Sequence, residues 1–148
     1  GKTTLLRMLV GMLEPSQGPA DRVVLIDFGF ASVEGSAKLT QQGAIVGSLQ
    51  YMAPERMRGE PIDQRSDLYS MGVIFYELLA GTPPFLAKDD LDLVEMHLHA
   101  TPPPLDPAAV PPALIPIIMR CLAKQQAQRF ANAREMIAAL EDAARQMS

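Results

Sequence analysis

The sequence has few of the residues that form cross-links or bind metals. It contains one cysteine, no tryptophan and two histidines among 148 residues. The single cysteine, Cys121, excludes an internal disulfide and fits a reducing compartment, so we expect a cytoplasmic protein in which Cys121 is a small core residue. His97 and His99 are two residues apart and lie on different faces of a helix, which favours ordinary surface positions over a metal site.

The sequence also lacks clustered positive charge and long apolar runs. Thirteen Lys and Arg residues against 17 Asp and Glu give a net charge of −4, and the basic residues are dispersed. This pattern argues against nucleic acid or an anionic membrane as a partner. The longest apolar stretch, residues 68–80, is interrupted by Glu77 and is too short to span a bilayer. No signal peptide precedes the strand predicted at residues 23–26, so we expect no membrane segment.

The composition is that of a globular chain with one core. Hydrophobic residues make up 48% and charged residues 20% of the 148 residues, which predicts one domain, or one domain and a fragment. The first residue is Gly rather than Met. We therefore expect that the chain was cut from a longer protein.

Residues 26–55 are the part of the chain around which the rest is arranged. Four apolar residues, 23–26, predict a short strand, and Asp27 places a carboxylate at its end, where it can hold a metal ion. A polar loop follows, in which Ser36 and Thr40 are candidate phosphorylation sites.

The Asp-Phe-Gly of residues 27–29, followed at this distance by the Ala-Pro-Glu of residues 53–55, resembles the activation segment of eukaryotic-type (bacterial Hanks-type) serine/threonine protein kinases. The resemblance implies that Asp27 binds Mg²⁺ and that Ser48 contacts the catalytic base and helps to set hydroxyl preference. It also implies structural roles for six residues, which are Phe28, Gly29, Pro54, Glu55, Asp67 and Arg129.

The remaining chain resembles the helical lobe of the same family. The string SDLYSMGVIFYELLAGTPPF resembles the central helix of that lobe, and the apolar residues on nearly all its sides predict a buried helix that starts at Ser66 or Asp67 and ends before Gly81. By resemblance, Asp67 hydrogen-bonds the backbone of the catalytic loop, and Arg129 pairs with Glu55.

Local signals predict the other helices. Residues 54–57 should form a short helix, and Asp89 or Asp90 should cap a helix whose apolar face is formed by Leu91, Val94 and Leu98. An extended linker over 101–105 follows. A further helix should carry Pro116 in its first turn, and the last helix should begin with a capping box. The residues of that box are Asn132 and Glu135.

Residues 1–18 have a different resemblance. GKTTLLRMLVGMLEPSQG resembles the Walker A helix region of ABC-transporter ATPases, with Lys2 and Thr3 as a weak remnant of a phosphate-binding loop whose front half is absent. Residues 1–19 are thus predicted as an ATPase-like fragment and residues 20–148 as a partial protein kinase domain, with the kinase resemblance beginning at about residue 21.

The predicted fold is mainly α: a partial kinase C-lobe, with a short β-strand before the activation segment and an N-terminal helix. The family uses ATP and Mg²⁺ to phosphorylate protein substrates, and the resemblance to bacterial signalling kinases suggests further signalling modules in a parent protein. The glycine-rich loop, the strand Lys and the His-Arg-Asp loop are absent from this sequence. We therefore expect no tight ATP binding and no kinase activity from the chain alone, and exposed apolar surface on the 68–80 helix. The alternatives are a non-catalytic, kinase-derived interaction module and a P-loop ATPase fragment.

Overall fold

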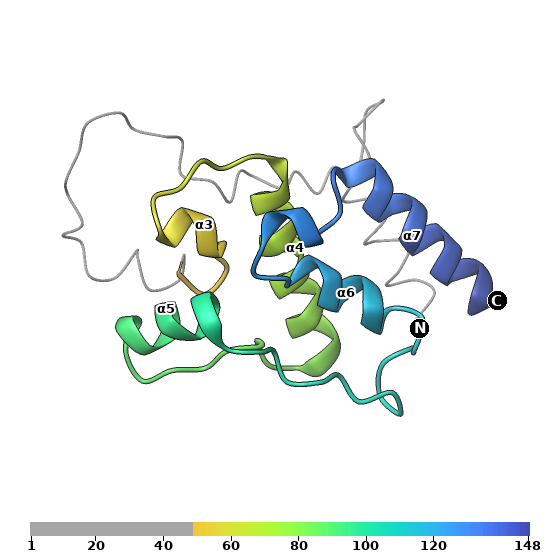
Figure 1. Cartoon of the computed structure of the whole chain (residues 1–148). Helices are drawn as coiled ribbons and strands as arrows, with labels where there is room; N and C mark the ends of the chain where they lie inside the picture. Colours follow the sequence, from red (N-terminus) through yellow and green to blue (C-terminus); the bar gives the residue numbers. More distant parts are fainter. Residues whose placement is uncertain (1–48) are drawn as a thin grey trace, which may run out of the picture.

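The computed structural model describes residues 49–148, and this part of the chain is helical (Figure 1). No strand occurs among these residues. The helices, in chain order, are α3 (Pro54–Met57), α4 (Gln64–Ala80), α5 (Asp90–His99), α6 (Ile115–Cys121), the 3₁₀ helix η1 (Gln126–Gln128) and α7 (Ala133–Gln146). This agrees with the predicted helical lobe. The predicted strand at residues 23–27 and the predicted N-terminal helix lie outside the described residues.

Helix α4 stands at the centre of the described fold. Helix α6 packs against it and α7 packs against α6, while α3 and α5 pack together on the other side (Figure 1). Helix α4 is buried along most of its length, as its apolar sequence predicts. Among its large apolar residues only Leu78 is exposed, at 52%.

The start of α4 differs from the prediction. The helix begins at Gln64, two residues before Ser66, because Asp63 is its N-cap and accepts a hydrogen bond of 2.8 Å from the Arg65 backbone N–H. An Asp in this position satisfies one of the free N–H groups of the first turn. The end of α4 is as predicted: Gly81 has φ of +80° and donates to the carbonyl of Glu77 at 2.8 Å.

Gly72 lets α4 and α6 approach closely. A Cβ atom at residue 72 would lie 2.5 Å from Cβ of Cys121 and 3.3 Å from Cδ2 of Leu122. Cys121 is fully buried, and burial raises the pKa of its thiol to about 12. It is therefore the inert core residue that its isolation in the sequence predicts.

Gly72→Ala is expected to lower the free energy of unfolding by up to about 2 kcal/mol. The clash falls on a Cβ atom rather than on the flexible end of a side chain, and overpacking of this kind costs about 1–3 kcal/mol. The higher helix propensity of Ala than of Gly offsets about 1 kcal/mol of this cost. Urea unfolding measures the change.

A Cys121→Gly background provides the control, because it removes the atom that clashes. There, Gly72→Ala should be neutral or stabilising. Equal destabilisation by Gly72→Ala in both backgrounds would contradict the steric explanation.

Helix α5 is capped as predicted but presents a different face to the core. Asp89 accepts from the Asp92 N–H at 2.9 Å. The buried residues are Leu93 and His97, whereas Leu91 is 82% exposed. Of the predicted apolar face, Val94 and Leu98 are half-buried and Leu91 is exposed, and the prediction missed Leu93 and His97 as the buried residues of the helix.

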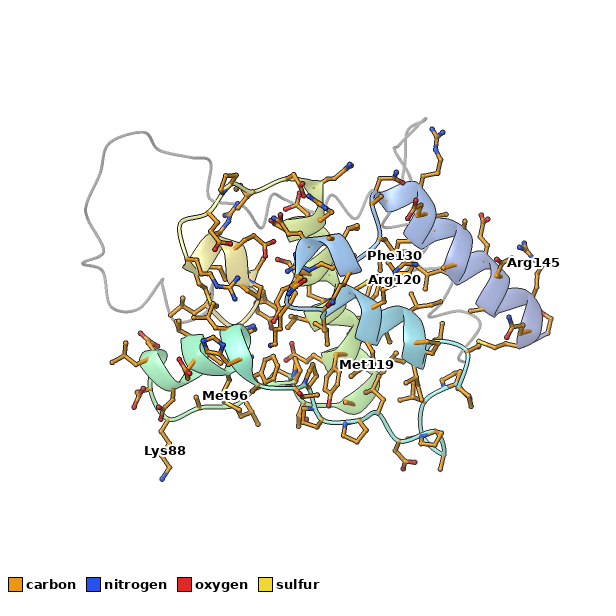
Figure 2. The ribbon with its side chains drawn as sticks, in the orientation of Figure 1. Lys88, Met96, Met119, Arg120, Phe130 and Arg145 are labelled. Carbon is orange, nitrogen blue, oxygen red and sulfur yellow. The ribbon has the colours of Figure 1, made fainter. Side chains whose placement is uncertain are left out.

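The two C-terminal helices begin where local signals place them. Pro116 lies in the first turn of α6. Asn132 accepts from the Glu135 N–H at 3.0 Å, and the Glu135 carboxylate accepts from the Ala131 N–H at 3.1 Å, which completes a variant of the predicted capping box. Figure 2 shows Arg120 of α6 beside Phe130, with the guanidinium carbon 4.1 Å from the ring centroid.

No helix in residues 49–148 is long and apolar enough to cross a membrane.

Candidate functional site

A buried ion pair joins the start of α3 to the segment between α6 and α7. Nη1 and Nη2 of Arg129 lie 2.7 and 2.8 Å from Oε1 and Oε2 of Glu55, a bidentate pairing of residues 74 positions apart. Each residue is only 2% exposed. The structure thus contains the ion pair between Glu55 and Arg129 that the kinase resemblance implies.

The guanidinium of Arg129 uses all five of its N–H donors. Besides Glu55 it donates to three backbone carbonyls, and these are Ala123 at 2.8 Å, Arg65 at 3.0 Å and Lys124 at 3.2 Å. Ser66 completes the site, because its hydroxyl donates to Oε1 of Glu55 at 2.6 Å. Buried charges need such full hydrogen bonding to offset their desolvation.

The environment keeps Glu55 ionised. Burial by itself would raise the pKa of its carboxyl, but hydrogen bonds from Arg129 and Ser66 outweigh burial and lower that pKa from 4.5 to about 2. The pair is therefore charged at neutral pH. It joins α3 to the segment between α6 and α7, and through the Arg65 carbonyl to the start of α4.

Residues 49–53, called the platform below, precede this ion pair and are held on α4 by side-chain hydrogen bonds. Tyr51 donates from its hydroxyl to Oε2 of Glu77 at 2.7 Å, and its carbonyl accepts from the Ser70 hydroxyl at 2.6 Å. The Gln50 side-chain amide donates to the carbonyl of Phe85 at 2.8 Å. The hydrogen bond to Glu77 raises the pKa of Tyr51, so the phenol stays a donor.

A second polar group lies beside the ion pair, inside the core. The guanidinium carbon of Arg129 is 4.9 Å from the centroid of the Tyr69 ring. The Tyr69 hydroxyl lies 2.8 Å from Nδ1 of His97, so the expectation that His97 is a surface residue was wrong. A buried imidazole is tolerated here because Tyr69 supplies a partner for one ring nitrogen. His99 has an exposed side chain, as expected.

The structure describes only some of the predicted site residues. It brings Glu55 and Arg129 together, and Pro54 occupies the first position of α3. Asp67 lies exposed in the first turn of α4, and its proposed contact with a catalytic loop stays a prediction. Eight predicted residues lie outside residues 49–148; they are Lys2, Thr3, Asp27, Phe28, Gly29, Ser36, Thr40 and Ser48.

Sequence reasoning missed several residues that hold the platform or complete the ion pair. Glu77 carried a usable signal, because a carboxylate inside a buried helix needs a partner. Ser66, Ser70 and Gln50 carried none, since short polar side chains are common at helix starts and in loops. Within residues 49–148 no group of three or more His, Cys, Asp or Glu residues is placed to hold a metal ion. Asp27 stays the predicted Mg²⁺ ligand.

Comparison with known sequences identifies the family. The profile of the protein kinase domain matches residues 12–140. The chain therefore belongs to the protein kinase family, and it is a serine/threonine protein kinase family domain. The match begins inside the ATPase-like segment, and the division at residues 19–20 stays a prediction.

The chain is similar to several bacterial serine/threonine-protein kinases. It is 38% identical over 138 residues to pkn3 of Myxococcus xanthus, covering 88% of this chain and 25% of that protein. It is 39% identical over 127 residues to PknD of Mycobacterium tuberculosis (84% and 19%) and 38% identical over 122 residues to PknB of Mycolicibacterium smegmatis (80% and 20%). The chain spans a quarter or less of the length of these relatives.

Proposed function

We propose that residues 49–148 form the substrate-binding side of a serine/threonine protein kinase, and that a longer protein containing them transfers phosphate from ATP to serine or threonine hydroxyls of proteins. The observation that supports this most is the platform. Its residues are fixed to α4 on one side and end on the buried pair of Glu55 and Arg129 on the other.

This arrangement suits a reaction that depends on positioning. Phosphoryl transfer in kinases is mainly orientation and charge neutralisation, so the acceptor polypeptide has to be held still against a rigid surface. Three hydrogen bonds hold Gln50 and Tyr51 on the core. The described residues therefore supply the orientation of the acceptor.

We expect neither ATP nor Mg²⁺ to bind this chain tightly. Residues 49–148 contain no acidic cluster for a metal, and the sequence contains no glycine-rich kinase loop and no His-Arg-Asp loop. By resemblance, Asp27 would bind the metal and Ser48 would contact the base. We therefore propose that the 148-residue chain alone does not transfer phosphate.

The purified 148-residue chain is expected to show no phosphate transfer from radiolabelled ATP with Mg²⁺ to a mixture of Ser- and Thr-containing peptides. The reason is that the nucleotide cradle and the base together contribute several orders of magnitude in rate. The matched control is Asp27→Asn, whose signal should equal that of the parent chain. Transfer by the parent chain that disappears in Asp27→Asn would contradict the proposed inactivity.

The kinase assignment has a separate test. Residues 49–148 are grafted in place of the matching segment of PknB from Mycolicibacterium smegmatis, and the chimera is assayed for phosphorylation of a protein substrate. Activity in the chimera, and its loss in a chimera carrying Arg129→Met, is the expected result. A folded but inactive chimera would favour the alternative, a non-catalytic kinase-derived interaction module.

A further inference from the structure

His97 links three separate parts of the described fold. It lies on α5, and its side chain is fully buried. Nδ1 lies 2.8 Å from the Tyr69 hydroxyl on α4, and the ring meets Phe85 edge to face with centroids 5.0 Å apart. Lys124 fixes the same end of α5, because Nζ donates to the carbonyl of His97 at 2.7 Å.

Both aromatic neighbours of His97 also contact the proposed substrate site. The Phe85 carbonyl accepts the Gln50 side-chain amide of the platform at 2.8 Å. The Tyr69 ring lies against Arg129 of the buried ion pair. His97 is therefore connected to the platform through Phe85 and to the ion pair through Tyr69.

Packing alone does not explain a histidine at residue 97. Its Nε2 is buried and has no hydrogen-bond partner among the described residues, and an unpaired buried polar atom lowers stability. An apolar side chain would fill the same space without this cost. The histidine is better explained by its contacts with Tyr69, through Nδ1, and with Phe85, through the ring.

We propose that His97 is a positioning residue for the substrate platform, fixing Tyr69 and Phe85 so that helix α5 and residues 49–53 keep one relative arrangement. This inference rests on the proposed function in one respect, namely that residues 49–53 receive the protein substrate. The coupling itself is a property of the folded chain and is measurable without any activity.

The test uses a double variant of the full 148-residue chain, Tyr69→Phe with His97→Leu. Removing both polar partners leaves no unpaired hydroxyl in the core, so the fold is expected to persist. The reporters are the Met52 N–H, which donates to the Leu49 carbonyl within the platform, and the side-chain amide of Gln50. Hydrogen exchange by NMR follows both, and α7 amides report global opening.

In the double variant, the Met52 N–H is expected to exchange about tenfold faster. This is the change in rate that corresponds to losing the free energy of about one hydrogen bond. The Gln50 side-chain amide signal should shift, while the melting temperature does not fall and exchange in α7 is no faster than in the parent. His97→Asn, which retains an acceptor near Nδ1 for Tyr69, should restore part of the protection. The matched control, His99→Gln on the exposed side of α5, should change nothing.

Two results would overturn the proposal. One is parent-like exchange at Met52 in the double variant, and the other is acceleration of equal size in α7, which would show a loss of general stability only. An inactive PknB chimera combined with the expected exchange pattern would contradict the proposed function and leave the coupling intact. An active chimera without the exchange pattern would contradict the coupling alone.

Discussion

Replacing Arg129 by Met is expected to lower the free energy of unfolding of the chain by about 3–5 kcal/mol, the cost of removing one partner from a buried ion pair. The variant leaves the Glu55 carboxylate in the core with only the Ser66 hydroxyl as a side-chain donor. Three backbone carbonyls lose their donor as well. Since domains of this size are stable by about 5–15 kcal/mol, this is a large part of the total.

Urea unfolding followed by circular dichroism measures this loss. The matched control is Arg145→Met, because Arg145 pairs with Asp142 on the exposed surface of α7, and exposed pairs contribute about 0–1 kcal/mol. If Arg129→Met does not fold, the same measurement is made on Glu55→Gln, which keeps the size of the side chain and one acceptor oxygen. Glu55→Gln should lower the free energy of unfolding by more than Arg145→Met does. Equal effects at residues 129 and 145 would contradict a structural role for the buried pair.

Glu55 and Arg129 also show how the fold depends on contacts that are distant in sequence. Neither residue carries a local signal for its partner, since 74 positions separate them. Only the resemblance to the kinase family predicted the pair. The residues that complete it, Ser66 and three backbone carbonyls, became visible only in the structure, because they meet through tertiary packing.

Helix ends could be predicted because their chemistry is local. Asp89 and Asn132 accept hydrogen bonds from N–H groups three residues further along the chain, and Gly81 ends α4 by donating to the carbonyl four residues before it. The prediction missed the start of α4 because the first two helical residues after the N-cap Asp63 are polar. Gln64 and Arg65 therefore show no helical spacing of apolar residues. The buried face of α5 was missed for a different reason. His97 is polar, and its partner Tyr69 comes from another helix.

His97 should also make the stability of the chain depend on pH in the range where the histidines of most proteins titrate. Burial, and after it the nearby charge of Lys124, lower the pKa of its imidazole from 6.5 to about 4, against a smaller opposing effect of the Gln50 backbone. Tyr69 faces the ring from α4, and Arg129 with Glu55 lies on the far side of Tyr69. The folded chain therefore keeps this ring neutral at pH values at which the unfolded chain protonates it.

The sign follows from proton binding. Between pH 6.5 and about 4 the unfolded state binds more protons at His97 than the folded state, so stability falls as pH falls through this range. The difference between 6.5 and about 4, at 1.36 kcal/mol per pH unit, corresponds to a loss of about 3 kcal/mol. Glu55, whose pKa is lowered to about 2, adds a further loss only below about pH 4.5. The two groups thus act in windows that overlap little.

Urea unfolding at intervals from pH 7 to pH 4 tests this assignment. In Tyr69→Phe with His97→Leu, the loss of stability between pH 6.5 and pH 4.5 should largely disappear, and the loss below pH 4.5 should remain because Glu55 is unchanged. The control is His99→Gln, at an exposed residue of the same helix, which should keep the full pH dependence. An unchanged slope above pH 4.5 in the double variant would show that His97 is not the group that titrates, and a slope removed by His99→Gln would assign the titration to His99 instead.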